Sequence, residues 1–166
     1  MEPLQAPSPF NEGGTLGGSG NLNGLVTVAG TLAPGESPGT LHFTNDLTLK
    51  NSASLNIEIT GINPGAFDIL NGNGSNTLII DGILALDNTG YTGVRGDSIT
   101  IFTNWDTVSG TFSSITGTDL EDGLEWDTRN IYSTGSMTVI PEPSSVTLLL
   151  LSFLAMITQH YKSQKK

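Results

Sequence analysis

The chain of 166 residues carries 16 acidic and six basic side chains, which gives a net charge of −10, and it contains no cysteine. Its length fits one domain of about 120 residues with tails. The acidity argues against nucleic acid or anionic lipid as a partner of the body, because both require clustered Lys or Arg. The lack of cysteine excludes disulfides and thiolate chemistry. Abundant Gly, Ser, Thr and Asn residues favour short strands and tight turns over helices.

Residues 1–24 are predicted to be a flexible leader. They contain Pro3, Pro7 and Pro9, followed by two Gly-rich stretches. The first residues carry neither a basic segment nor an apolar core, so no secretory signal peptide is predicted here.

Residues 25–140 are predicted to form an ectodomain of short strands separated by Gly- and Pro-containing turns. The alternation of apolar and polar residues is clearest in Ser54–Thr60, where Leu55, Ile57 and Ile59 are expected to face the core. The predicted strands are Leu25–Val28, Thr40–Phe43, Asp46–Lys50, Ser54–Thr60, Ala66–Leu70, Thr77–Ile80, Ile83–Asp87, Ser98–Thr103, Thr107–Phe112 and Ser136–Ile140.

Two all-β architectures fit this pattern, an antiparallel β-sandwich and a parallel β-solenoid. The scarcity of Asn-Gly hairpins between strands of equal length favours the solenoid only slightly. A solenoid would stack one coil on the next, with short apolar side chains inside and polar turns at the corners. The composition alone leaves both architectures open.

The segment Gly30–Leu41, GTLAPGESPGTL, resembles a repeat of autotransporter passenger domains and related bacterial surface proteins. Asp46–Leu49 and Ser54–Ile59 resemble the strands that follow this repeat, and Phe67-Asp68 with Thr77–Asp87 resembles its end. The likeness covers about residues 25–87. It implies that the body is a short right-handed parallel β-helix.

The last segment, residues 141–166, has three parts: Pro141-Glu142-Pro143, an apolar run and a basic end. The prolines are expected to end the preceding strand. A helix over about residues 144–161 would be about 27 Å long, and lysine side chains could extend to the far interface of a membrane. The apolar residues expected to form this transmembrane anchor are Val146, Leu148, Leu149, Leu150, Leu151, Phe153, Leu154 and Ile157. The basic residues are Lys162, Lys165 and Lys166 in the tail 162–166, which the positive-inside rule assigns to the cytoplasm.

This tail resembles the PEP-CTERM sorting signal. The resemblance implies that an exosortase, an enzyme of the inner membrane, acts near Pro141-Glu142-Pro143. The chain would be inserted in the inner membrane of a Gram-negative bacterium during sorting, with its body on the periplasmic side. It would then be delivered to the cell envelope or to an extracellular matrix, where extracellular polysaccharide is a further expected partner.

The sequence predicts no catalytic residues and no cofactor. His42 lies between Leu41 and Phe43, so in a strand it is expected to face solvent. There is no Gly-x-Ser-x-Gly nucleophile motif. Five carboxylates cluster in one Gly-flanked segment, where they are expected to stay solvated: Asp119, Glu121, Asp122, Glu125 and Asp127.

These carboxylate oxygens are better suited to binding calcium than to catalysis, and Asp119, Glu121 and Asp122 form a weak candidate site. The sequence lacks the loop pattern of an EF-hand and the Gly-Gly-x-Gly-x-Asp repeat. We therefore predict no specific metal site.

Three aromatic residues, Trp105, Trp126 and Tyr132, could stack against sugars, but they are expected to cap the last coil of the core. These features predict an exported surface protein with a structural or adhesive role, not an enzyme. One alternative is a carbohydrate-active β-helix enzyme, a polysaccharide lyase or hydrolase. It would need a cleft with converging acids and Arg95 or Arg129. Another alternative is a truncated gene remnant that is not exported.

Overall fold

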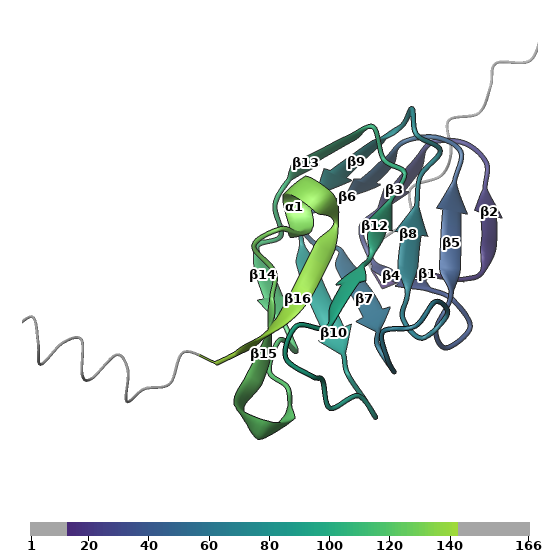
Figure 1. Ribbon diagram of the computed structural model, residues 1–166. Coiled ribbons are helices and arrows are strands. Elements are labelled where there is room, and N and C mark those ends of the chain that lie inside the picture. Colours follow the sequence, from purple (N-terminus) through teal and green to yellow (C-terminus); the bar gives the residue numbers. More distant parts are fainter. Residues whose placement is uncertain (1–12, 143–166) are drawn as a thin grey trace, which may run out of the picture.

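The computed structural model describes residues 13–142, which form a parallel β-solenoid (Figure 1). Its largest sheet, the five-stranded sheet, has the order β1 (Thr15–Gly18), β4 (Thr31–Pro34), β7 (Ser54–Glu58), β10 (Ile83–Asp87) and β14 (Ser114–Thr116). The β2–β12 sheet consists of β2 (Gly20–Leu22), β5 (Thr40–Phe43), β8 (Ile69–Asn71) and β12 (Phe102–Thr103). The β3–β13 sheet consists of β3 (Val26–Val28), β6 (Leu47–Leu49), β9 (Thr77–Ile80) and β13 (Thr107–Gly110).

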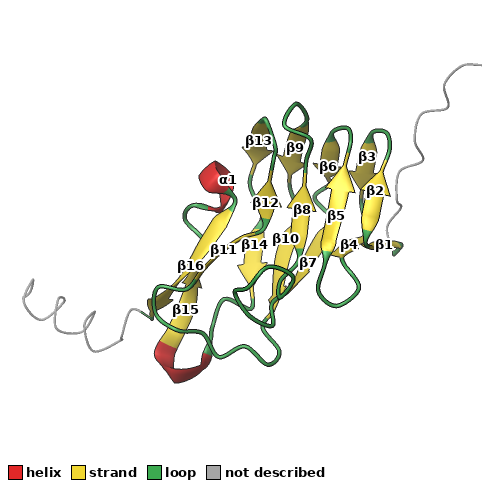
Figure 2. Cartoon of the chain, turned by 45° about the vertical axis from the view of Figure 1, so that its right-hand side comes forward, coloured by secondary structure: helices red, strands yellow, loops and turns green. Residues whose placement is uncertain are grey.

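The chain visits these three sheets in a fixed order, so that each full coil contributes one strand to each sheet. All strand pairs within the three sheets are parallel. Figure 2 shows the strands of successive coils standing side by side. The all-β, parallel-strand architecture expected from the sequence is confirmed, and the antiparallel sandwich is not the fold of the body.

A ladder of apolar side chains covers the face of the five-stranded sheet that points into the solenoid. Leu16, Leu32, Leu55, Leu84 and Ile115 occupy equivalent positions of five successive strands. The central three have no solvent exposure. Their neighbours along each strand point outward, because side chains alternate between the two faces of a strand. Repeating one short apolar residue per coil thus builds a core that runs along the solenoid axis.

An antiparallel cap sheet covers the C-terminal end of the solenoid. It consists of β11 (Ser98–Thr100), β16 (Ser136–Pro141) and β15 (Leu124–Asp127), with β16 in the middle. A 3₁₀ turn, η1 (Glu121–Gly123), precedes β15, and one helical turn, α1 (Ile131–Thr134), precedes β16. The buried side chains of Trp126, Ile131, Met137 and Val139 close the core at this end.

Most strands predicted from the sequence are present, and Thr40–Phe43, Thr77–Ile80 and Ile83–Asp87 have the predicted bounds. The predicted Ser98–Thr103 strand is divided between the cap sheet and the solenoid, as β11 and β12. Leu55, Ile57 and Ile59 face the core as expected, each with no solvent exposure.

Strands β1 and β2 lie inside the range that the sequence assigned to a flexible leader, so part of residues 1–24 belongs to the solenoid. These two strands were not predicted because they are rich in Gly, which is depleted in ordinary strands. Here the neighbouring coil supplies the hydrogen bonds, and β1 pairs with β4 over four residues. A Cβ atom on Gly17 would lie 2.9 Å from the carbonyl oxygen of Ala33, so this glycine permits the close approach of the two coils.

Candidate binding groove

A groove opens on the outer surface of the five-stranded sheet where β4 and β7 separate. The two strands pair only through Thr31–Ser54 and Leu32–Leu55, whereas β7 and β10 stay paired as far as Glu58 and Asp87. Pro34 ends β4, and its missing N–H removes a possible ladder hydrogen bond. The chain then leaves the sheet through a loop that includes Ser37. The gap left beside β7 is a groove of about 310 Å³.

The groove has a floor of small side chains and a polar rim. Ala33, Asn56 and Ala85 belong to three successive strands and form its floor, because they alternate with buried residues along those strands. The full set of lining residues is Ala33, Pro34, Gly35, Ser37, Asn56, Ile57, Glu58, Asp68, Ala85, Leu86 and Asp87. Three of these eleven side chains are acidic and none is basic.

Asp68 connects the loop of the groove to β7. Its side chain is only 3% exposed, and its two carboxylate oxygens accept hydrogen bonds from the backbone N–H groups of Gly39, at 2.7 Å, and Glu58, at 2.8 Å. Burial raises the pKa of Asp68, and the nearby Glu58 carboxylate adds to this, although the two backbone hydrogen bonds oppose the increase. Both oxygens therefore have structural partners, and Asp68 serves to position the loop and the rim.

Glu58 and Asp87 are direct neighbours on the outer face of the sheet. They are register partners on β7 and β10, and each follows a buried residue on its strand. Adjacent strands lie about 4.8 Å apart, so the two residues start from neighbouring backbone positions, while their carboxylates have different hydrogen-bond partners. Ser37 Oγ donates a hydrogen bond of 3.0 Å to Glu58. The hydroxyl and backbone N–H of Thr89 donate to Asp87, and these hydrogen bonds lower the pKa of Asp87.

This arrangement suits the binding of donor groups better than acid catalysis. Carboxylate and amide oxygens on an open surface accept hydrogen bonds from hydroxyl and ammonium groups. General acid catalysis needs an accessible carboxyl whose pKa is raised. Asp68 has a raised pKa but is buried with both oxygens occupied, and Asp87 is accessible but has a lowered pKa.

No protein-family model matches this chain, and no curated protein sequence is significantly similar to it. The resemblances noted above thus rest on their motifs, and the candidate site rests on its geometry.

The carboxylates singled out in the sequence lie elsewhere. Asp119 and Glu121 line a second hollow, of about 340 Å³, next to Tyr91 in the cap region, while Asp122 is exposed in η1. Within residues 13–142, no group of three or more His, Cys, Asp or Glu side chains is arranged to hold a metal ion. Asp119, Glu121 and Asp122 therefore do not form such a group.

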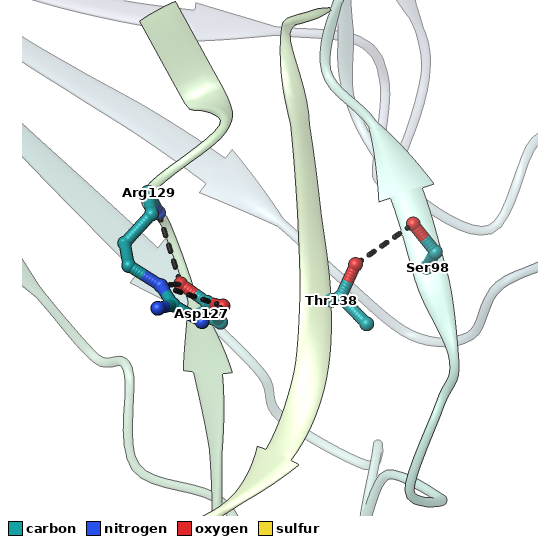
Figure 3. A network of polar contacts seen from close by, with 4 residues as sticks. All are labelled: Ser98, Asp127, Arg129 and Thr138. Atoms are coloured by element: carbon teal, nitrogen blue, oxygen red, sulfur yellow. Dashed lines mark hydrogen bonds and ion pairs between the residues drawn. The ribbon is translucent and has the colours of Figure 1, made fainter.

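Neither of the arginines considered for an enzyme reaches the groove. Arg129 forms an ion pair of 2.6 Å with Asp127 two residues earlier, at the end of β15 (Figure 3). In the same view, Thr138 on β16 donates a hydrogen bond to Ser98 on β11 across the cap sheet. Arg95 is exposed and does not line the groove either. Among residues 13–142, no basic side chain lines the groove.

His42 projects from the outer face of β5, as predicted, but it is half-buried there. Its Nδ1 lies 2.7 Å from the side-chain amide nitrogen of Asn71, its neighbour on β8. Asn71 in turn accepts hydrogen bonds from Thr103 and Asn104. His42 thus belongs to a polar ladder that connects consecutive coils, with no acid or nucleophile among these partners.

The three aromatic residues considered for sugar stacking pack against the core. Trp126 is buried and donates a hydrogen bond to Asn88, and Trp105 packs on the buried ring of Phe43. Tyr132 packs against Phe112 and accepts a hydrogen bond from its backbone N–H. The contacts of Trp126 and Tyr132 agree with their expected role as caps of the last coil, whereas Trp105 packs on Phe43 of β5 and donates a hydrogen bond to the carbonyl of Leu70 on β8.

The predicted tail lies mostly outside the described residues. Pro141 is the last residue of β16, Glu142 follows it, and Pro143 with the expected helix 144–161 and the tail 162–166 falls beyond. Between residues 13 and 142, no helix has the length and apolar character needed to cross a membrane.

The residues of the groove were not selected from the sequence. A signal was present, because β7 and β10 share an apolar alternation that ends in an acid, Leu-Asn-Ile-Glu58 and Leu-Ala-Leu-Asp87. Their register, and the departure of β4, were needed to show that the two acids flank one groove.

Proposed function

We propose that this protein is an exported cell-envelope protein that contacts extracellular polysaccharide through the groove between β4 and β7. Its role is structural or adhesive. The observation that carries the proposal is the groove itself: an open channel on a rigid sheet, with a floor of small side chains and a rim of hydrogen-bond acceptors. Sugar hydroxyl groups supply the donors that such a rim lacks.

The solenoid supports a role in display. Its strands are fixed by neighbouring coils, so side chains on the outer face keep a regular spacing along the axis. We take the coils to be right-handed, as nearly all crossovers between parallel strands are. A rigid ladder of this kind can contact successive units of a polymer without a closing movement.

The tail supports export and sorting. Pro141-Glu142-Pro143 is followed by the apolar run of residues 146–157 and then by three lysines. We propose that an exosortase recognises this tail while the chain is held in the inner membrane, with the solenoid on the periplasmic side. The solenoid would then be released to the envelope or the surrounding matrix.

The test is to express the full chain in a Gram-negative, polysaccharide-producing host that has an exosortase, and to measure its location and intact mass. We expect envelope or matrix protein whose mass ends near Pro141–Pro143. A variant lacking residues 141–166 should leave the membrane fraction. Full-length protein that stays in the cytoplasm, or identical partitioning of both chains, would contradict the sorting proposal.

A second candidate function is hydrolysis of a polysaccharide. It is favoured by one observation, the side-by-side placement of Glu58 and Asp87 in the groove. Retaining glycosidases hold two carboxylates about 5 Å apart. The lowered pKa of Asp87 argues against its use as a general acid. Release of reducing ends from polysaccharide by the purified chain, lost in a Glu58→Gln variant, would favour this function over adhesion.

A further inference from the structure

We propose that the groove binds a cationic, amine-bearing polysaccharide. This inference rests on the proposed function and names the class of polymer that the groove accepts. Glu58 and Asp87 stand directly opposite each other on neighbouring strands, with the buried Asp68 behind them. Like charges in that position destabilise a sheet, and an opposite charge placed between them would remove the repulsion.

The protein supplies no such charge from the part of the chain that the structure describes. Residues 13–142 contain three basic side chains, Lys50, Arg95 and Arg129, and none of them lines the groove. The one ion pair among these residues is Arg129–Asp127 on the cap sheet. The acidic rim is therefore complementary to a cation from outside, and a sugar ammonium group donates up to three hydrogen bonds to it.

The walls of the groove favour a sugar chain over a basic peptide. Extended peptides bind to sheets by adding a strand to an open edge. Beside the groove, the backbone N–H and C=O of Glu58 are already paired with the carboxylate and the N–H of Asp68. The floor offers the methyl groups of Ala33 and Ala85.

The polar groups of the groove are matched to sugar rings. Asn56 lies on the floor between the two alanines; its side-chain oxygen accepts a hydrogen bond of 2.8 Å from Ser54, and its NH₂ group can donate hydrogen bonds to ring hydroxyls. Ser37 lies beside Glu58 and donates a hydrogen bond of 3.0 Å to its carboxylate. A volume of about 310 Å³ is at the small end of known ligand sites, which run from about 300 to 1,000 Å³, and fits a short stretch of a chain whose remainder lies outside.

The test uses the full chain and two probes of matched length, a glucosamine oligosaccharide and its N-acetylated counterpart, measured by titration calorimetry at low salt. Only the first carries ammonium groups. We expect the glucosamine oligosaccharide to bind at least about tenfold more tightly than the neutral one, which corresponds to about 1.4 kcal/mol. Its affinity should fall as salt is added, because exposed charges are screened.

Two variants locate the site. Glu58→Gln/Asp87→Asn should lower the affinity for the glucosamine oligosaccharide at least about tenfold. The matched control, Asp106→Asn/Glu121→Gln, removes the same charge at exposed positions away from the groove and should change the affinity less than about twofold. Ala85→Leu fills the floor without changing charge and should also weaken binding. Circular dichroism checks that each variant remains folded.

Several outcomes would overturn the inference. They are no binding of the glucosamine oligosaccharide, equal losses in the groove and control variants, or tighter binding of a lysine oligopeptide that the groove variant abolishes. Binding of the host's own polysaccharide that survives Glu58→Gln/Asp87→Asn would also reject this groove as the site. That last result would also reject the groove named in the proposed function, whereas equal binding of the two oligosaccharides, lost in Glu58→Gln/Asp87→Asn, would reject only the cationic class, so the two proposals can fail separately.

Discussion

The two ends of the solenoid differ in their side chains and in their strand pairing. The first coil, β1–β3, has no charged residue between residues 13 and 35, and its largest side chains are leucines. The C-terminal end is covered by an antiparallel sheet in which Trp126 is buried and stacks on Tyr91, with ring centroids 5.6 Å apart. Among residues 13–142, no strand pairs with the outer edges of β1, β2 or β3.

The two ends differ because of the way in which a solenoid is stabilised. Each coil is stabilised by its neighbours, so a coil with one described neighbour is held less firmly than a central one. At the C-terminal end, aromatic area and a cross-strand sheet replace the missing neighbour. At the first coil, Leu16 and Val26 remain 8% and 9% exposed, whereas Leu55 in the centre is fully buried. We therefore expect substitutions of core residues to cost most in the centre, less under the C-terminal cap and least in the first coil.

The largest loss of stability should come from a substitution in the central coils, because both ends pack on them. Leu55→Asp places an unpaired charge in the core between Leu32 and Leu84, a change that costs about 4 kcal/mol or more. We expect both ends to unfold together, measured by circular dichroism for the sheets and by tryptophan fluorescence for the C-terminal half. The control Asn56→Asp adds the same charge one residue further, on the outer face, and should leave the fold intact. An unaltered melting curve for Leu55→Asp would reject the core position of this residue.

The next prediction compares the two ends directly. Trp126→Ala should reduce the free energy of unfolding by about 3–5 kcal/mol, because it leaves a large cavity under the cap and removes the hydrogen bond to Asn88. Leu16→Ala should cost about 2 kcal/mol, at the low end for leucine, because the first coil can relax. Urea denaturation measures both. A cost for Leu16→Ala that equals that of Trp126→Ala would contradict the proposed difference between the ends.

A smaller effect, with a characteristic pH dependence, is expected from Asp68, which lies between the two ends. Asp68→Asn should cost about 1–3 kcal/mol, because an amide can accept from only one of the two backbone N–H groups without opposing the other. Burial raises the folded-state pKa of Asp68 above its usual 3.8. The contribution of this group to stability is therefore fully present below its unfolded pKa and is lost as the pH rises through the folded pKa.

The cost of Asp68→Asn should thus be larger at pH values below about 4 than at neutral pH. Urea denaturation of both proteins over this range measures the difference, and the other titrating groups largely cancel in the comparison. A cost that grows as the pH rises would show that the carboxylate is stabilised by folding, and that its hydrogen bonds outweigh its burial.

The parts of this fold that could be predicted are those that depend on one residue and its neighbours in sequence. In Ser54–Glu58, alternation alone identified the buried face, because side chains of a strand change face at every residue. The strands β1 and β14 were missed for the opposite reason. Gly17 looks like a turn residue, and Ser114–Thr116 is a run of only three residues, so the extended conformation of both segments depends on pairing with the adjacent coil.

The groove could not be predicted because it depends on register. Glu58 and Asp87 are far apart in sequence, and nothing in either segment shows that they are direct neighbours. Asn76, at a corner of the solenoid, is another residue whose role depends on contacts with a neighbouring coil. It is buried, donates hydrogen bonds to the carbonyl groups of Phe43 and Asn45 in the preceding coil, and looks in the sequence like an ordinary loop residue. The position of the groove and the role of Asn76 depend on contacts between coils, which the composition does not show.

The smallest effect is expected from His42, and it separates the outer polar ladder from the core. His42 contacts Asn71 on the next coil, while Asn71 also accepts hydrogen bonds from Thr103 and Asn104. His42→Ala removes one partly exposed hydrogen bond and should cost less than about 1 kcal/mol. Asn71→Ala removes all three and should cost more. Polysaccharide binding should be unchanged in His42→Ala, because the residue lies on another sheet from the groove. A loss of binding there would move the functional surface from the five-stranded sheet to the β2–β12 sheet and reopen a catalytic role for the histidine.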